Sequence, residues 1–136
     1  MRTEELMRGD LLFYKGKLNA FPFKVEQITK KKIGYHVEPN ENRMYYLHPS
    51  EVFPIPLTRE ILERNGFGYC ESDAVLNHYY PGEPHFCKNM SLHIGHSIDK
   101  DVYWLNYQNN SIYGILYVHQ LQHAFKVCGI NKEIEI

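Results

Sequence analysis

The chain has 136 residues, 43% of them hydrophobic and 23% charged, and its formal net charge is −1. This composition excludes a disordered chain, and the length fits one domain or two small units that share a core. The near-neutral charge excludes a uniformly basic protein whose overall field would draw it to nucleic acid or to an anionic membrane.

The first part of the chain has the pattern of short strands joined by tight turns. Apolar residues alternate with other residues in segments 21–25 and 33–37, which is the period of a half-buried strand. Pro54 and Pro56 end this pattern, because proline cannot donate a hydrogen bond to a central ladder. We therefore expect residues 1–57 to form an SH3-like β unit, either a small barrel or a curled meander.

Two helices are predicted in the rest of the chain. Thr58 can cap a helix over residues 58–65, and Asn65 and Gly66 supply a left-handed stop after it. A second helix is predicted over about residues 117–128, because apolar residues recur there with helical period.

Strand-like segments lie between the two helices, over about residues 68–116, and predict an antiparallel meander. The closing "EIEI" is expected to add a short strand to a sheet edge. The predicted fold class is α+β, with residues 58–136 as a second unit that shares one compact body with the first.

Cysteine usage and hydropathy predict a cytoplasmic protein. The sequence has an odd number of cysteines, Cys70, Cys87 and Cys128, and no CxxC pair. This usage is typical of reduced thiols rather than of a disulfide scaffold. The sequence has neither a signal-peptide pattern at Met1 nor an apolar window long enough for a membrane span.

The stretch "YVHQLQHAF" places His119 and His123 four residues apart on the second predicted helix. On a helical wheel both lie opposite the apolar stripe, so we expect both to face solvent. A zinc site needs a third ligand, and the general base of an HExxH motif is missing between them. The pattern favours an ordinary polar helix face, which is still able to contact a partner.

A second set of possible metal ligands is His85, Cys87 and His93, which share one strand parity. Their spacing matches no zinc signature, so we assign no metal and keep these three residues only as an alternative. The sequence also lacks a GxSxG elbow and a glycine-rich phosphate loop. We therefore predict no catalytic residue, no cofactor and no enzymatic activity.

Two further features are candidates for binding. Lys30, Lys31 and Lys32 form a basic turn that could meet phosphates while nearby tyrosines stack on bases, although several acidic residues in the same unit oppose this. Tyr103 and Trp104 are adjacent on a predicted strand, so one must enter the core and the other is a half-exposed aromatic that could anchor a protein partner, although core packing alone is the favoured interpretation.

Three blocks of the sequence resemble small proteins of Bacteroides-type bacteria and of their phages and prophages. They are "RGDLLFYKGK", a middle block with the pattern IPLT-E-L--NGF, and an ending that begins "YVHQLQ" and closes in "EI". The resemblance implies a mobile-element context and no particular activity. His119 and Gln122 belong to the third block whereas His123 does not, so His119 and Gln122 are the better candidates for a specific contact.

These observations predict a non-catalytic accessory protein of phage or mobile-element origin that binds a host or phage protein. A nucleic-acid-binding module that uses the lysine turn is the first alternative. Small-ligand sequestration and a metal-dependent enzyme are the others, and the oligomeric state is left open.

Overall fold

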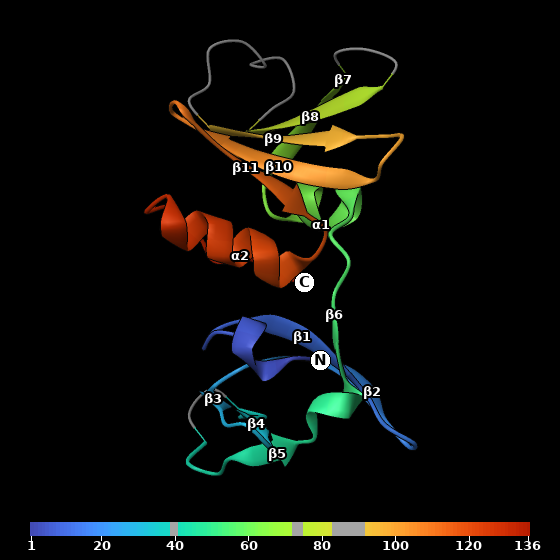
Figure 1. The fold of residues 1–136 in the computed structure, drawn as a ribbon, viewed down its shortest axis with the longest axis vertical. Coiled ribbons are helices and arrows are strands. Elements are labelled where there is room, and N and C mark those ends of the chain that lie inside the picture. Colours follow the sequence, from blue (N-terminus) through green and yellow to red (C-terminus); the bar gives the residue numbers. More distant parts are fainter. Residues whose placement is uncertain (39–40, 72–74, 83–91) are drawn as a thin grey trace. The chain divides into compact units, whose positions relative to one another are not determined.

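The computed structural model describes residues 1–38, 41–71, 75–82 and 92–136, which fall into two compact units, residues 1–55 and 56–136 (Figure 1). Both helices and antiparallel strands are present, in agreement with the predicted mixture of α and β structure. Among the helices of the described residues, none has the length and apolar character needed to cross a membrane.

The first unit contains two three-stranded antiparallel sheets, with strand orders β2-β1-β6 and β3-β4-β5. The strands are β1 (Leu11–Lys15), β2 (Ala20–Lys24), β3 (Gln27–Ile28), β4 (Ile33–Tyr35), β5 (Tyr45–Leu47) and β6 (Val52–Pro54), with 3-10 turns at Thr3–Glu5 and Pro49–Glu51. One cluster of buried side chains fills this unit, namely Leu6, Leu12, Phe23, Val25, Ile33 and Val52. The described strands belong to separate sheets and form no closed barrel. Pro54 ends an edge strand, where a missing N–H is tolerated.

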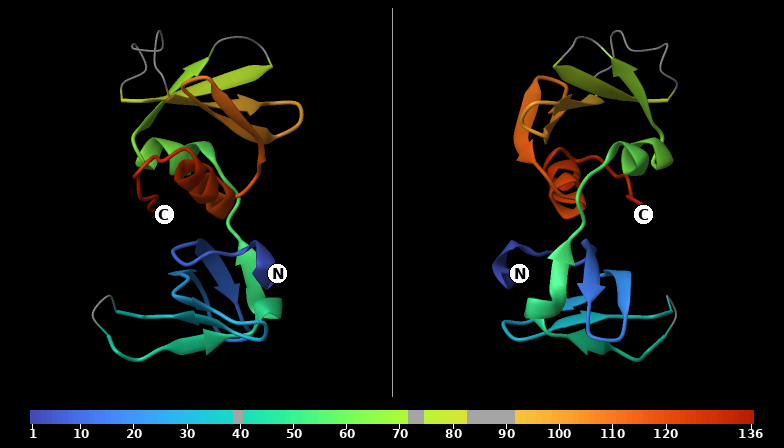
Figure 2. Two further views of the ribbon diagram at one scale, coloured as in Figure 1. Left: turned by 60° about the vertical axis from the view of Figure 1, so that its left-hand side comes forward. Right: turned by 90° about the vertical axis from the view of Figure 1, so that its right-hand side faces the viewer.

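The second unit is a five-stranded antiparallel meander with strand order β11-β10-β9-β8-β7, as predicted. Its strands are β7 (Phe67–Glu71), β8 (Leu76–Pro81), β9 (Leu92–Ser97), β10 (Val102–Tyr107) and β11 (Asn110–Ile115), and its helices are α1 (Arg59–Arg64) and α2 (Val118–Val127). Both helices lie on the same side of the sheet (Figures 1 and 2). The core of this unit therefore lies between the helices and one face of the sheet.

Helix α1 begins and ends where the sequence predicts. The Thr58 hydroxyl accepts a hydrogen bond from the Ile61 N–H at 3.3 Å, which caps the first turn. Gly66 ends the helix with a φ of +85°, a conformation that glycine adopts without the steric cost of a Cβ.

The prediction of a terminal strand at "EIEI" is wrong. Residues 133–136 contain no strand, although Ile134 is buried. The side-chain amide of Asn65 donates to the carbonyl oxygen of Glu135 and accepts from its N–H, both at 2.7 Å. The Asn65 side chain thus binds the backbone groups that a neighbouring strand would otherwise bind.

Candidate binding surface

The face of the five-stranded sheet that points away from α1 and α2 is called the open face here. In β10, Tyr103 and Leu105 are buried, so the alternation of a strand directs Trp104 to the opposite side. Trp104 is paired with Gly95 of β9 and with Tyr113 of β11. The register therefore places on this face side chains from strands that are distant in the sequence.

Five aromatic and imidazole side chains form a row across the open face. They are His78, Tyr80, His93, Trp104 and Tyr113. The His93 ring lies 5.2 Å from the Tyr80 ring and 5.3 Å from the His78 ring, between centroids. Trp104 lies 6.3 Å from His78 and 6.0 Å from Tyr113. Four of the five are half-buried, and Tyr113, which is 72% exposed, is the most accessible of them.

Gly95 makes room for the Trp104 side chain. A Cβ at position 95 would lie 2.1 Å from two carbon atoms of the indole ring, far inside van der Waals contact. The indole therefore lies directly over the backbone of β9, and only glycine fits beneath it. A side chain at this position would displace the largest ring of the row.

A short hydrogen-bond chain orients His93 within the row. The Asn106 side-chain N–H donates to His93 Nε2 at 2.8 Å, and the Ser111 hydroxyl donates to Asn106 Oδ1. Since Nε2 accepts, the proton of the neutral ring is on Nδ1. Burial lowers the pKa of His93 below its ordinary value of 6.5, and the neighbouring His78 lowers it further.

Among the described strand residues, those on the open face carry a formal charge only where a histidine is protonated. In the strand residues that the structure describes, the positions facing this side include no Lys, Arg, Asp or Glu. With His93 held in its neutral form, the surface presents aromatic rings with a few hydrogen-bonding groups. Such a surface favours a partner that is neither strongly anionic nor strongly cationic.

We expect the free energy of unfolding to decrease as the pH falls below about 6.5. The lowered pKa of His93 means that the unfolded chain takes up this proton first, so acid favours unfolding. Urea unfolding between pH 5 and pH 8 measures the effect. The variant His93→Gln should have a shallower pH dependence than the wild type. Equal pH dependences in the wild type and His93→Gln would contradict this assignment.

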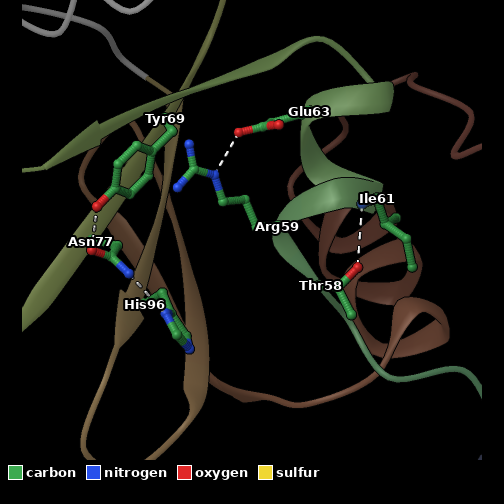
Figure 3. Close-up of polar contacts among 7 residues, drawn as sticks. All are labelled: Thr58, Arg59, Ile61, Glu63, Tyr69, Asn77 and His96. Carbon is green, nitrogen blue, oxygen red and sulfur yellow. Dashed lines mark hydrogen bonds and ion pairs between the residues drawn. The ribbon is translucent and has the colours of Figure 1, made fainter.

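A polar network lies on the other face of the sheet, beside α1 (Figure 3). The Arg59 guanidinium lies 3.9 Å from the centre of the Tyr69 ring, and the Tyr69 hydroxyl donates to Asn77 Oδ1 at 3.0 Å. Asn77 Nδ2 donates to His96 Nδ1 at 3.3 Å, while His96 Nε2 donates to Asp101 Oδ1 at 2.8 Å. Both nitrogens of His96 are therefore engaged in hydrogen bonds. The network holds α1 to the strands.

The prediction that Tyr103 and Trp104 lie on opposite faces of a strand is confirmed. Tyr103 is 5% exposed and its ring stacks on His96 at 4.2 Å, next to the equally buried Tyr79. Burial raises the pKa of Tyr79 to about 12, which keeps its hydroxyl neutral in the core. Tyr103 is thus a core residue, and of the predicted pair only Trp104 is available to a partner.

The prediction that His119 faces solvent is wrong, because this residue is 4% exposed. Its ring stacks on Tyr117 at 5.9 Å and meets the edge of His123 at 5.6 Å. The backbone of Leu57 also pairs with Leu116, so the segment entering α1 lies beside the start of α2. A helical wheel describes only α2 itself, so it does not include this neighbouring segment. Gln122, the other predicted contact residue of α2, is half-buried.

Only one residue of the alternative metal site lies within the residues that the structure describes. His85 and Cys87 lie outside the described residues, and His93 belongs to the open face. Within the ranges that the structure describes, no three His, Cys, Asp or Glu side chains are grouped so as to bind a metal ion.

The membership of three residues in the row was not predicted from the sequence, namely that of His78, Tyr80 and Tyr113. His78 and Tyr80 are two residues apart in "LNHYYP", and Tyr113 stands in "IYGILY". The alternation of side chains along a strand, with its period of two residues, was the signal that could have assigned each to a face. Their meeting with Trp104 depends on strand register, which the alternation does not contain. Comparisons with protein-family models, with curated proteins and with solved structures give no match for this chain.

Proposed function

We propose that this chain is a non-catalytic binding protein that docks a protein partner on the open face. The observation that carries the proposal is the row of rings that includes Trp104, on the face of the sheet that points away from the two helices. Trp and Tyr are the side chains most enriched at the energetic centres of protein interfaces.

The chemistry of the row favours a protein over a nucleic acid as its partner. Binding of a phosphate backbone depends on Lys and Arg side chains that release counterions, and the described positions on the open face provide none. The rings instead offer apolar area, while the Trp104 N–H and the Tyr113 hydroxyl can each form a hydrogen bond with a partner. A partner with an apolar patch flanked by hydrogen-bond acceptors fits this surface.

Three finer expectations from the sequence are part of this proposal. The resemblance of three blocks to phage and Bacteroides proteins favours a mobile-element accessory role, with a host or phage protein as the partner. The free thiols of Cys70 and Cys128 support action in the reducing cytoplasm. Two small antiparallel sheets around one core support an SH3-like arrangement of the first unit.

Capture from host lysate tests the proposal. The tagged chain and its Tyr113→Ser variant are each incubated with lysate, with and without nuclease, and bound proteins are quantified by mass spectrometry. Tyr113 is 72% exposed, so its replacement leaves the core unchanged. We expect a nuclease-resistant protein that binds the wild type and is lost from the variant. Retention of every captured protein by the variant, or loss of all of them on nuclease treatment, would refute docking on the open face.

A further inference from the structure

A second surface with a different chemistry lies in the first unit, at the turn between β3 and β4. Its three lysines, Lys30, Lys31 and Lys32, line an open depression of about 660 Å³ together with Tyr46 and His48. Strand β5 pairs with β4, and this pairing brings Tyr46 beside the turn. The volume lies within the range of small-ligand sites in proteins.

The turn that carries the lysines is closed by its own hydrogen bonds. The Thr29 hydroxyl accepts from the Lys32 N–H at 3.0 Å and from the Lys31 N–H at 3.4 Å. The Thr29 N–H donates to the Lys32 carbonyl oxygen at 2.9 Å. These bonds fix the backbone from which the three side chains project, so the positive charges are concentrated at one place.

Nearby acidic residues do not neutralise these charges. Within the described part of the chain, none of the three lysines forms an ion pair. Among the acids of this unit, Glu26 pairs with Arg8 at 3.2 Å, and Glu41 accepts a hydrogen bond from the Tyr45 hydroxyl at 3.3 Å. Three like charges side by side repel one another, and a bound anion relieves that repulsion.

Tyr46 adds a ring that is available for stacking. Its side chain is 49% exposed, and its hydroxyl donates to Gln27 Oε1 at 3.0 Å, which holds the ring in place. Lys32 Nζ lies 5.4 Å from the ring centre. His48 Nδ1 accepts from the Ser50 N–H at 3.2 Å, so the neutral ring carries its proton on Nε2 as a further donor.

We propose that this depression binds a nucleotide unit, with the base stacked on Tyr46 and the phosphate held by the lysine turn. Cationic side chains beside an exposed aromatic ring are the combination that sequence-tolerant recognition of single strands uses. The same chemistry is offered by a free nucleotide and by one nucleotide of a single strand. This site lies in the first unit and does not rest on protein docking at the open face.

Fluorescence anisotropy with a labelled 12-nucleotide oligo(dT) tests the proposal, with unlabelled thymidine monophosphate as competitor. The one phosphate held by the lysine turn predicts a log–log salt slope of about −0.7 on a single strand, so affinity should fall about fivefold between 20 and 200 mM salt. If the mononucleotide competes at a concentration similar to that of the unlabelled strand, the ligand is a free nucleotide. Competition only by the strand identifies single-stranded nucleic acid. A salt-independent affinity, or the absence of binding at low salt, would overturn the proposal.

Matched variants locate the binding. Lys31→Glu and Tyr46→Ala should each weaken binding at least about tenfold. Lys17→Glu makes the same charge change at another exposed turn of the first unit and should weaken binding less than threefold. All of these side chains are exposed, so each variant is expected to fold, and thermal unfolding verifies this. Equal losses in Lys17→Glu and Lys31→Glu would show a diffuse charge effect and would contradict a site at the turn.

Discussion

Replacement of Trp104 by alanine is expected to weaken binding of the open-face partner about 30-fold or more, which corresponds to roughly 2 kcal/mol. The indole is the largest ring of the row and lies between His78 and Tyr113, at 6.3 and 6.0 Å. Central, well-packed tryptophans of this kind dominate the binding energy of many interfaces. Calorimetry or surface plasmon resonance with the captured partner measures the change, at a temperature well below the unfolding midpoint of the variant.

Gly95→Ala provides an independent test of the same surface, because it removes no atom of the row. Its new Cβ would lie 2.1 Å from the indole carbons, so the ring has to leave its position over β9. We expect a loss of affinity similar to that of Trp104→Ala. Leu18→Ala is the control, since Leu18 is an apolar side chain that is 95% exposed in the first unit. An unchanged affinity in both open-face variants would exclude Trp104 as an anchor.

Asn65→Ala should reduce the free energy of unfolding by about 2–3 kcal/mol. The Asn65 side chain donates to the carbonyl oxygens of Ile61 and Glu135, at 2.8 and 2.7 Å, and accepts from the Glu135 N–H at 2.7 Å. Alanine leaves these backbone groups without the amide that pairs them, next to the buried Ile134. The residue thus joins the end of α1 to a segment 70 positions further along the chain.

Urea unfolding followed by circular dichroism measures this loss. Arg64→Ala serves as the control, because Arg64 is exposed in the same turn and its removal should cost no more than about 0.5 kcal/mol. We also expect Asn65→Ala to increase proteolysis near the C-terminal residues, because their backbone is no longer held. If the urea unfolding transitions of Asn65→Ala and Arg64→Ala had the same midpoint and the same slope, the link to Glu135 would contribute nothing to stability.

Features that depend on local geometry could be predicted from the sequence alone. The cap at Thr58 and the stop at Gly66 each depend on one side chain or one backbone conformation, and the structure confirms both. The period of two separates Tyr103 from Trp104 in any strand, so their opposite placement was predictable. The closely spaced strand segments likewise predicted an antiparallel meander, since short connections favour neighbouring antiparallel strands.

Which side chains meet could not be predicted in this way, because it depends on how distant segments pack in the folded chain. The row on the open face depends on the register of four strands, and the site at the lysine turn depends on the pairing of β4 with β5. His119 is buried, "EIEI" forms no strand, and the Asn65 side chain binds the backbone of Glu135 from 70 positions away. Local patterns fix the direction of each side chain relative to its own backbone. Contacts between segments depend on packing and register, which arise only when the whole chain folds.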